Sequence, residues 1–160
     1  MPDKAAAAFH WITNLLESHA IQYKITGGLA ARAYGVDRSL ADIDIEVEEK
    51  WIASIAQWVS PYIVYGPDRY KDISWDIQLM TLMYEGQEID IAAAEARIYN
   101  VKTATWELSI SNPSEYCTLM IYNKNVPVET LAELITYKEK LGRLVDKEDI
   151  RQLLYYAKKV

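Results

Sequence analysis

The chain of 160 residues is 51% hydrophobic and 25% charged, which is the composition of an ordinary globular domain that can bury its own core. Its single cysteine, Cys117, excludes an intramolecular disulfide and a cysteine-rich zinc site, and we expect a buried, inert thiol. The 17 basic and 23 acidic side chains give a net charge of −6, which argues against a protein that holds nucleic acid through a broad basic surface.

The acidic excess is concentrated in the first three quarters of the chain. Residues 124–160 hold eight basic and six acidic side chains, so the excess arises in residues 1–123. We expect neither a secretory leader nor a membrane-spanning segment, and hence a cytoplasmic protein with no membrane partner. Six acidic residues form a tight cluster around a single base, Arg38: they are Asp37, Asp42, Asp44, Glu46, Glu48 and Glu49.

Hydrophobic periodicity predicts helices and strands in alternation through the first part of the chain. The first predicted strand ends at Gly27-Gly28, and the short helix after it stops at Gly35. Acidic and β-branched residues alternate without interruption over 42–47, which predicts a strand with one carboxylate face and one core face. In chain order these elements are a helix over 4–19, a strand over 21–26, a helix over 29–34, a strand over 42–47 and a helix over 51–59.

The second part of the chain predicts a hairpin, two more strands and a pair of helices. The turn residues 85–87 separate the apolar segment 73–84 from the alternating segment 88–91, so we expect a β-hairpin with Asp90 on one face. The other expected elements are strands over 105–110 and 116–122, a helix over 128–141 and a second helix from about Asp146. Together the elements predict an α+β domain that ends in a helical hairpin.

Asp42 and Asp44 are candidate metal ligands. Alternate residues of a strand lie on one face, about 6.5 Å apart at the backbone, so both carboxylates can approach the same cation. Asp90 lies in a similar Ile-Asp-Ile pattern and offers a third carboxylate. Such ligands suit Mg²⁺ (or Mn²⁺), and paired ions suit phosphoryl transfer. A merely solvated acidic strand face has the same pattern, although clustered carboxylates oppose folding when no cation is bound.

Gly27 and Gly28 are candidate phosphate ligands. A glycine pair between a strand and a helix allows positive φ and lets backbone N–H groups approach a phosphate closely. A tight turn explains the same pair without any ligand, so both interpretations stay open at this point.

The spacing of these motifs resembles the DNA polymerase β-like nucleotidyltransferase superfamily. In that family a Gly-Gly or Gly-Ser pair precedes an Asp-x-Asp motif, and a third acidic residue follows on a neighbouring strand. Here the segment Leu29–Ala41, 13 residues long, separates the glycine pair from the first aspartate. The resemblance implies a small mixed β-sheet flanked by helices, two divalent ions bound by Asp42, Asp44 and Asp90, and transfer of a nucleoside monophosphate from a nucleoside triphosphate.

The chain is also similar to small bacterial members of that superfamily, of the abortive-infection toxin type and the lincosamide nucleotidyltransferase type. Arg38 matches an arginine suited to binding phosphate, and Lys138 lies in a matching Leu-Ile-x-x-Lys segment, which implies a substrate-binding role. The chain departs from the pattern of these relatives at Leu29, Leu40 and Val145.

Four charged residues near the C-terminus also have a structural interpretation. Lys138 and Arg143 lie near the end of a predicted helix, where cations interact favourably with the helix dipole. Asp146 can act as an N-cap and Asp149 as its capping-box partner. Of these four, we predict a substrate role for Lys138 alone.

These patterns predict a metal-dependent nucleotidyltransferase formed by one domain over 1–160, with a core over 21–91 and a C-terminal helical segment over 128–157. The three aspartates would be catalytic, and the acceptor hydroxyl could belong to a small molecule, a protein or a tRNA end. The alternative is a fold relative with little turnover that acts as a binding module, such as a toxin–antitoxin component with a partner protein. The departures at Leu40 and Val145 favour this alternative, whereas the presence of all three carboxylates favours the enzyme.

Overall fold

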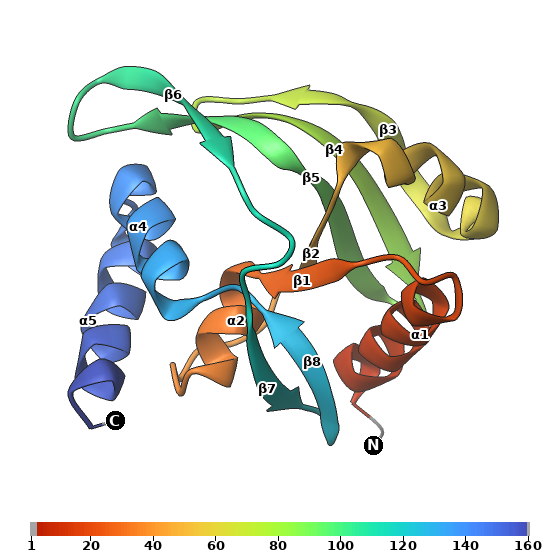
Figure 1. The fold of residues 1–160 in the computed structure, drawn as a ribbon, viewed down its shortest axis with the longest axis horizontal. Coiled ribbons are helices and arrows are strands. Elements are labelled where there is room, and N and C mark those ends of the chain that lie inside the picture. Colours follow the sequence, from red (N-terminus) through yellow and green to blue (C-terminus); the bar gives the residue numbers. More distant parts are fainter. Residues whose placement is uncertain (1–2, 160) are drawn as a thin grey trace.

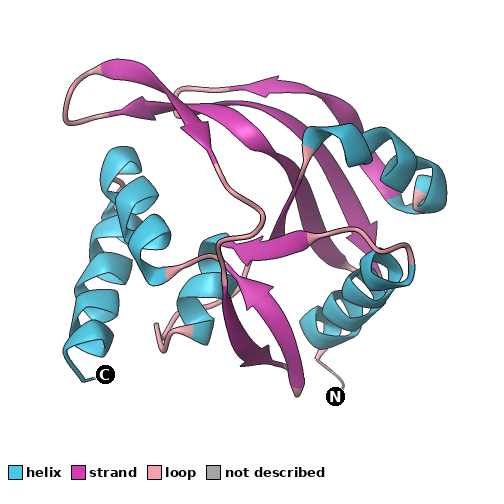
Figure 2. Cartoon of the chain, in the orientation of Figure 1, coloured by secondary structure: helices cyan, strands magenta, loops and turns pink. Residues whose placement is uncertain are grey.

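The computed structural model describes residues 3–159, which form five α-helices, two 3-10 helices and eight strands (Figures 1 and 2). The helices are α1 (Lys4–Ser18), α2 (Gly27–Ala33), α3 (Ile52–Trp58), α4 (Leu131–Leu141) and α5 (Leu144–Lys159), with 3-10 turns η1 (Glu49–Trp51) and η2 (Ser60–Tyr62). The strands are β1 (Tyr23–Thr26), β2 (Asp42–Val47), β3 (Ile63–Lys71), β4 (Trp75–Tyr84), β5 (Gln87–Asn100), β6 (Thr105–Ile110), β7 (Cys117–Ile121) and β8 (Lys124–Val128).

All eight strands belong to one mixed sheet, in the order β3-β4-β5-β2-β1-β8-β7, and β6 pairs with the second half of β5. Strand β2 is antiparallel to β1 and parallel to β5. The parallel register places Asp44 opposite Asp90, so the two sequence motifs meet on neighbouring strands. Beyond β2, the long strands β3–β6 curve into an arch above α4 in Figure 1.

The two faces of β2 differ as the alternating sequence predicts. Ile43, Ile45 and Val47 are buried, whereas the acidic residues between them are half-buried on the opposite face. The isoleucines join a core cluster with Phe9 of α1 and Ile55 of α3. Helices α1, α2 and α3 therefore supply the apolar support from which the acidic face is presented.

The structure confirms most of the elements expected from periodicity. The hairpin of β4 and β5, strands β6 and β7, and the C-terminal pair α4 and α5 all form where they were predicted, within a few residues. Strand β3 was missed because it lies at the sheet edge and its residues are mostly exposed, so it lacks the alternation that marks a half-buried strand.

The prediction of a helix from Val128 was wrong at its start. Residues 124–128 form β8, which lies between β1 and β7 and buries Val126 and Val128. Helix α4 begins only after Thr130, whose hydroxyl accepts a hydrogen bond from the Glu133 backbone N–H. Pairing with β1, which is distant in sequence, thus holds Val128 in an extended strand conformation although the local periodicity favours a helix there.

Two smaller expectations also change. Gly27 and Gly28 are not a separate turn before a helix; they form the first turn of α2 itself. Cys117 is half-buried rather than buried, because its strand β7 is an edge of the sheet. Among residues 3–159, no helix has the length and apolar character needed to cross a membrane.

We expect Ile45→Ala to destabilise the protein by about 2–5 kcal/mol, because Ile45 is fully buried at the centre of the sheet and its truncation leaves a cavity. Urea unfolding followed by circular dichroism measures this change. Val64→Ala is the matched control: Val64 is 61% exposed on β3, and its truncation should leave the unfolding midpoint nearly unchanged. Equal losses in both variants would contradict the assignment of the core to this face.

Candidate active site

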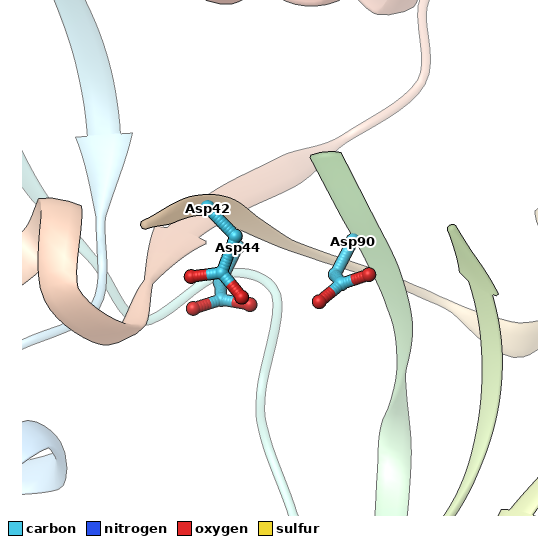
Figure 3. A group of neighbouring side chains, drawn as sticks. All are labelled: Asp42, Asp44 and Asp90. Carbon is cyan, nitrogen blue, oxygen red and sulfur yellow. The ribbon is translucent and has the colours of Figure 1, made fainter. Parts of the chain in front are cut away.

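Asp42, Asp44 and Asp90 converge on the acidic face of the sheet (Figure 3). Each offers a carboxylate oxygen, and these three oxygens lie within 4.8 Å of one another. Asp42 and Asp44 come from alternate positions of β2, and Asp90 comes from the adjacent parallel strand β5. Three convergent hard oxygen ligands fit a divalent cation such as Mg²⁺ or Mn²⁺.

Burial and neighbouring carboxylates oppose the ionisation of Asp44 and Asp90. Burial raises the pKa of Asp44 well above its ordinary value, and the negative charges of Asp42 and Asp90 raise it further. Burial also raises the pKa of Asp90 to about 6, although the Thr81 hydroxyl, which donates to Asp90 Oδ1 at 2.6 Å, acts in the opposite direction. A bound cation would remove this repulsion, so the electrostatics as well as the geometry fit a metal centre.

Gly27 and Gly28 lie directly beside the aspartates. Gly27 adopts φ +64°, and a Cβ atom at this position would overlap the Asp44 carboxylate. A Cβ atom at Gly28 would lie 3.2 Å from Cζ of Arg38. Glycine is therefore required at position 27 for both conformation and space, and the pair leaves backbone groups open beside the aspartates and the Arg38 guanidinium.

Arg38 and Lys138 are tied together by a buried carboxylate. Asp149 Oδ2 accepts hydrogen bonds from Arg38 Nη1 at 2.6 Å and from Lys138 Nζ at 2.9 Å. Lys138 and Asp149 are each 1% exposed, whereas the Arg38 side chain keeps 26% of its surface exposed. The positive charge of Lys138 lowers the pKa of Asp44, so this lysine acts on the acidic site electrostatically from a buried position.

The capping roles considered for Asp146 and Asp149 are thereby revised. Helix α5 begins at Leu144, and Asp146 Oδ2 accepts from the backbone N–H of Arg143 at 3.1 Å, which is the reciprocal half of a capping box. Asp149 lies one turn further along and does not cap the helix, because its carboxylate is used by Arg38 and Lys138. Sequence spacing alone could not reveal this, since Arg38 lies 111 residues away.

A cleft of about 760 Å³ opens over the acidic face. Its lining includes every candidate residue from the sequence: Gly27, Gly28, Arg38, Asp42, Asp44, Asp90 and Lys138. Residues that sequence reasoning did not select also line it, notably Glu129, Glu133 and Tyr137 at the start and middle of the C-terminal helical segment. Recognising 124–128 as a strand would have placed Glu129 next to the site, because the residue after that strand lies beside the end of β1.

No protein-family model matches the sequence, and a search of curated proteins finds no match. Several solved structures are similar. A Thermotoga maritima protein, TM1012, provisionally described as a nucleotidyltransferase, has a TM-score of 0.74 at 20% identity, covering 97% of this chain and 95% of that chain. The lincosamide antibiotic adenylyltransferase LnuA, bound to lincomycin, has a TM-score of 0.60 at 16% identity, covering 91% and 93%.

A third structural neighbour is ANT(2")-Ia in complex with adenylyl-2"-tobramycin, with a TM-score of 0.65 at 15% identity and coverage of 94% of this chain and 88% of that chain. The chain therefore has the nucleotidyltransferase fold. The mixed sheet and the C-terminal helices agree with this, and the fold expected from the sequence motifs is confirmed.

We expect Asp44→Asn to raise the melting temperature of the metal-free protein at pH 8 by about 3–6 °C. The folded-state pKa of Asp44 lies above its unfolded value, so the stability present at low pH is lost as pH rises through the folded pKa. Asparagine removes that charge, and the gain should shrink toward pH 4. Thermal unfolding in a chelator measures it, with the exposed Glu139→Gln as control. A gain of equal size at both pH values would contradict the electrostatic cause.

We expect Asp149→Asn to destabilise the protein by about 3 kcal/mol, because two cations lose their shared buried counter-ion. Urea unfolding at pH 7 gives the free energy. Glu148→Gln, one position earlier on α5, breaks an exposed ion pair with Arg151 and should change the unfolding midpoint little. If both variants lost the same stability, Asp149 would not be the buried link between α5 and the site.

Proposed function

We propose that this protein transfers a nucleoside monophosphate from a nucleoside triphosphate to a hydroxyl acceptor. The observation that carries the proposal is the convergence of Asp42, Asp44 and Asp90 beside Gly27-Gly28 in one cleft. The nucleotidyltransferase fold, shared with two antibiotic adenylyltransferases, supports the same reaction class. Among the described residues 3–159, these aspartates are the only group of three or more His, Cys, Asp or Glu side chains placed to hold a metal ion.

Each residue has a role that follows from its position. Asp42, Asp44 and Asp90 would hold Mg²⁺ or Mn²⁺, which when bound supplies charge neutralisation for the triphosphate and the leaving pyrophosphate. The backbone N–H groups at Gly27 and Gly28 would donate to phosphate oxygens, and the exposed part of the Arg38 guanidinium would contact the same phosphates.

Lys138 contributes differently from Arg38. Its ammonium group is buried and bonded to Asp149, so it orients Asp149 and supplies positive charge behind Asp44 rather than contacting the nucleotide directly in this conformation. Asp90 is the candidate acceptor of the proton from the attacking hydroxyl, because its carboxylate lies with those of Asp42 and Asp44 where the metal and the acceptor would meet.

We propose a small-molecule acceptor over a protein side chain or a tRNA end. A cleft of about 760 Å³ has room for a nucleotide and a small second substrate, and the net charge of −6 disfavours extended contact with RNA. The neighbours bound to lincomycin and to adenylyl-2"-tobramycin are consistent with this class. Leu40 and Val145, the departures that favoured a binding module such as a toxin–antitoxin component, are absent from the residues that line the cleft within 3–159.

Calorimetry with each nucleoside triphosphate, with and without Mg²⁺, tests the proposal. We expect binding that requires the metal and is weakened at least about 100-fold in the double variant Asp42→Ala/Asp44→Ala, because both charges on β2 are removed. Glu48→Gln and Glu49→Gln are controls, since these acidic residues belong to the same sequence cluster but are absent from the cleft lining among residues 3–159. The nucleotidyltransferase assignment would be overturned if the triphosphate bound equally well with and without Mg²⁺. It would also be overturned if the double variant bound the triphosphate as tightly as the wild type.

A further inference from the structure

A second group of carboxylates lines the cleft beside the catalytic aspartates. Glu46 lies on β2, Glu129 follows β8, and Glu133 lies in the first turn of α4. One buried cation, Lys24 of β1, accompanies them. The proposed metal centre uses none of these four residues, and three acidic side chains against one ammonium give this wall of the cleft an excess of acidic groups.

The sheet places this second group at a defined position. Strand β1 pairs Lys24 with Glu46 and Thr26 with Asp44, so these four side chains share the acidic face. The Glu129 backbone N–H donates to the Ile25 carbonyl at 2.9 Å, which places Glu129 on the far side of β1 from Asp44. Two strand spacings separate them, about 10 Å at the backbone. One small molecule can therefore span the distance from the catalytic aspartates to Glu129.

Lys24 does not neutralise the whole group. Its Nζ lies 3.0 Å from the Asn112 carbonyl, 3.1 Å from the Glu115 carbonyl and 3.4 Å from Glu133 Oε2. An ammonium has three hydrogens, and these three acceptors account for all of them. Glu46 remains at 3.7 Å, within range of the charge but outside hydrogen-bond distance.

One buried acceptor on this wall awaits a donor. Glu129 Oε2 is inaccessible to solvent and has no hydrogen-bond partner among the described residues 3–159. Glu129 lines the cleft. Burial, followed by the charges of Glu46 and Glu133, raises the pKa of Glu129 well above its ordinary value. An unpartnered buried carboxyl group is costly, so a cationic donor from a ligand would be strongly favoured here.

We propose that Glu129, together with Glu46 and Glu133, binds an ammonium group of the acceptor substrate. This rests on the proposed nucleotidyl transfer, since it assigns the second substrate of that reaction. The triphosphate is anionic and would be repelled by this wall, so the ligand that matches it is the other substrate. With about 10 Å between the Asp44 and Glu129 backbones, a ligand of one or two sugar rings can place a hydroxyl at the aspartates and an ammonium group at Glu129.

Other residues of the cleft suit the same class of ligand. Trp75 of β4 and Tyr137 of α4 both line the cleft, with ring centroids 6.1 Å apart, and Ile77 and Leu79 extend an apolar surface from Trp75 along β4. Aromatic and apolar side chains pack against the faces of rings, while the acidic wall selects charge. An uncharged, ring-shaped molecule would pack against these apolar side chains but would leave Glu129 without a hydrogen-bond donor.

Binding to the intact protein, without nucleotide or metal, tests the proposal separately from the reaction. The probes are the β-1,4-linked disaccharide of glucosamine, its neutral N,N′-diacetyl form and cellobiose, which share size and linkage but differ in charge. We expect the amine form to bind at least about tenfold more tightly than both neutral forms, as measured by calorimetry or ligand-observed NMR. Glu129→Gln should abolish that preference, and the exposed Glu139→Gln on α4 should preserve it.

Several outcomes would overturn this assignment. They are equal binding of charged and neutral disaccharides, an unchanged preference in Glu129→Gln, or loss of the preference in Asp44→Asn, which would place the amine on the metal site. If Glu129→Gln does not fold, Glu46→Gln takes its place, with a partial loss of the preference expected. Metal-dependent triphosphate binding is measured on the same samples. If the triphosphate binds in a metal-dependent way but the amine preference is missing, only the assignment of the acceptor is overturned. If metal-dependent triphosphate binding is missing, the proposed nucleotidyl transfer is overturned.

Discussion

Repulsion between like charges on one face of the sheet is the constraint on which the rest of this structure depends. The parallel pairing of β2 with β5 brings one carboxylate oxygen from each of Asp42, Asp44 and Asp90 within 4.8 Å of the others. Each isolated carboxylate would favour water, so their convergence must be enforced by the burial of Ile43 and Ile45 on the opposite face. The hydrophobic core thus fixes an arrangement that the charges themselves oppose.

The C-terminal helical pair stabilises the same site with opposite charge. Lys138 from α4 and Asp149 from α5 form a buried ion pair, and Asp149 also holds Arg38, which lies beside Gly28. A single carboxylate therefore couples the two helices to the loop before β2. This explains why a segment that begins far from the aspartates in sequence belongs to the functional site: it supplies the buried cation whose charge lowers the pKa of Asp44.

The cleft has two chemically distinct halves. The glycine pair and Arg38 offer donors that suit phosphate, whereas Glu46, Glu129 and Glu133 form a wall that suits a cation. In the proposed reaction, the anionic triphosphate and the cationic acceptor would each be oriented by groups of opposite charge beside the aspartates. The net charge of −6 is partly this local design and not only a property of the outer surface.

The sequence by itself determined the faces of the central strand, because side-chain alternation in a strand is a local property with a period of two residues. Asp42 and Asp44 could be assigned to one face and Ile43 to the other without any coordinates, and the glycine pair could be assigned to the end of a strand. The helices and hairpins follow from similarly local periodicity.

Only the tertiary structure decided which residues from distant segments meet. Strand pairing brings Asp90 to Asp44 and turns 124–128 into a strand, which delivers Glu129 to the cleft; neither event is encoded in a short window of sequence. Likewise, Asp149 resembles a helix cap locally but is a buried counter-ion, because Arg38 reaches it across 111 residues. Hydrogen bonding between strands and desolvation of ion pairs depend on the whole chain, and these two effects assembled the site.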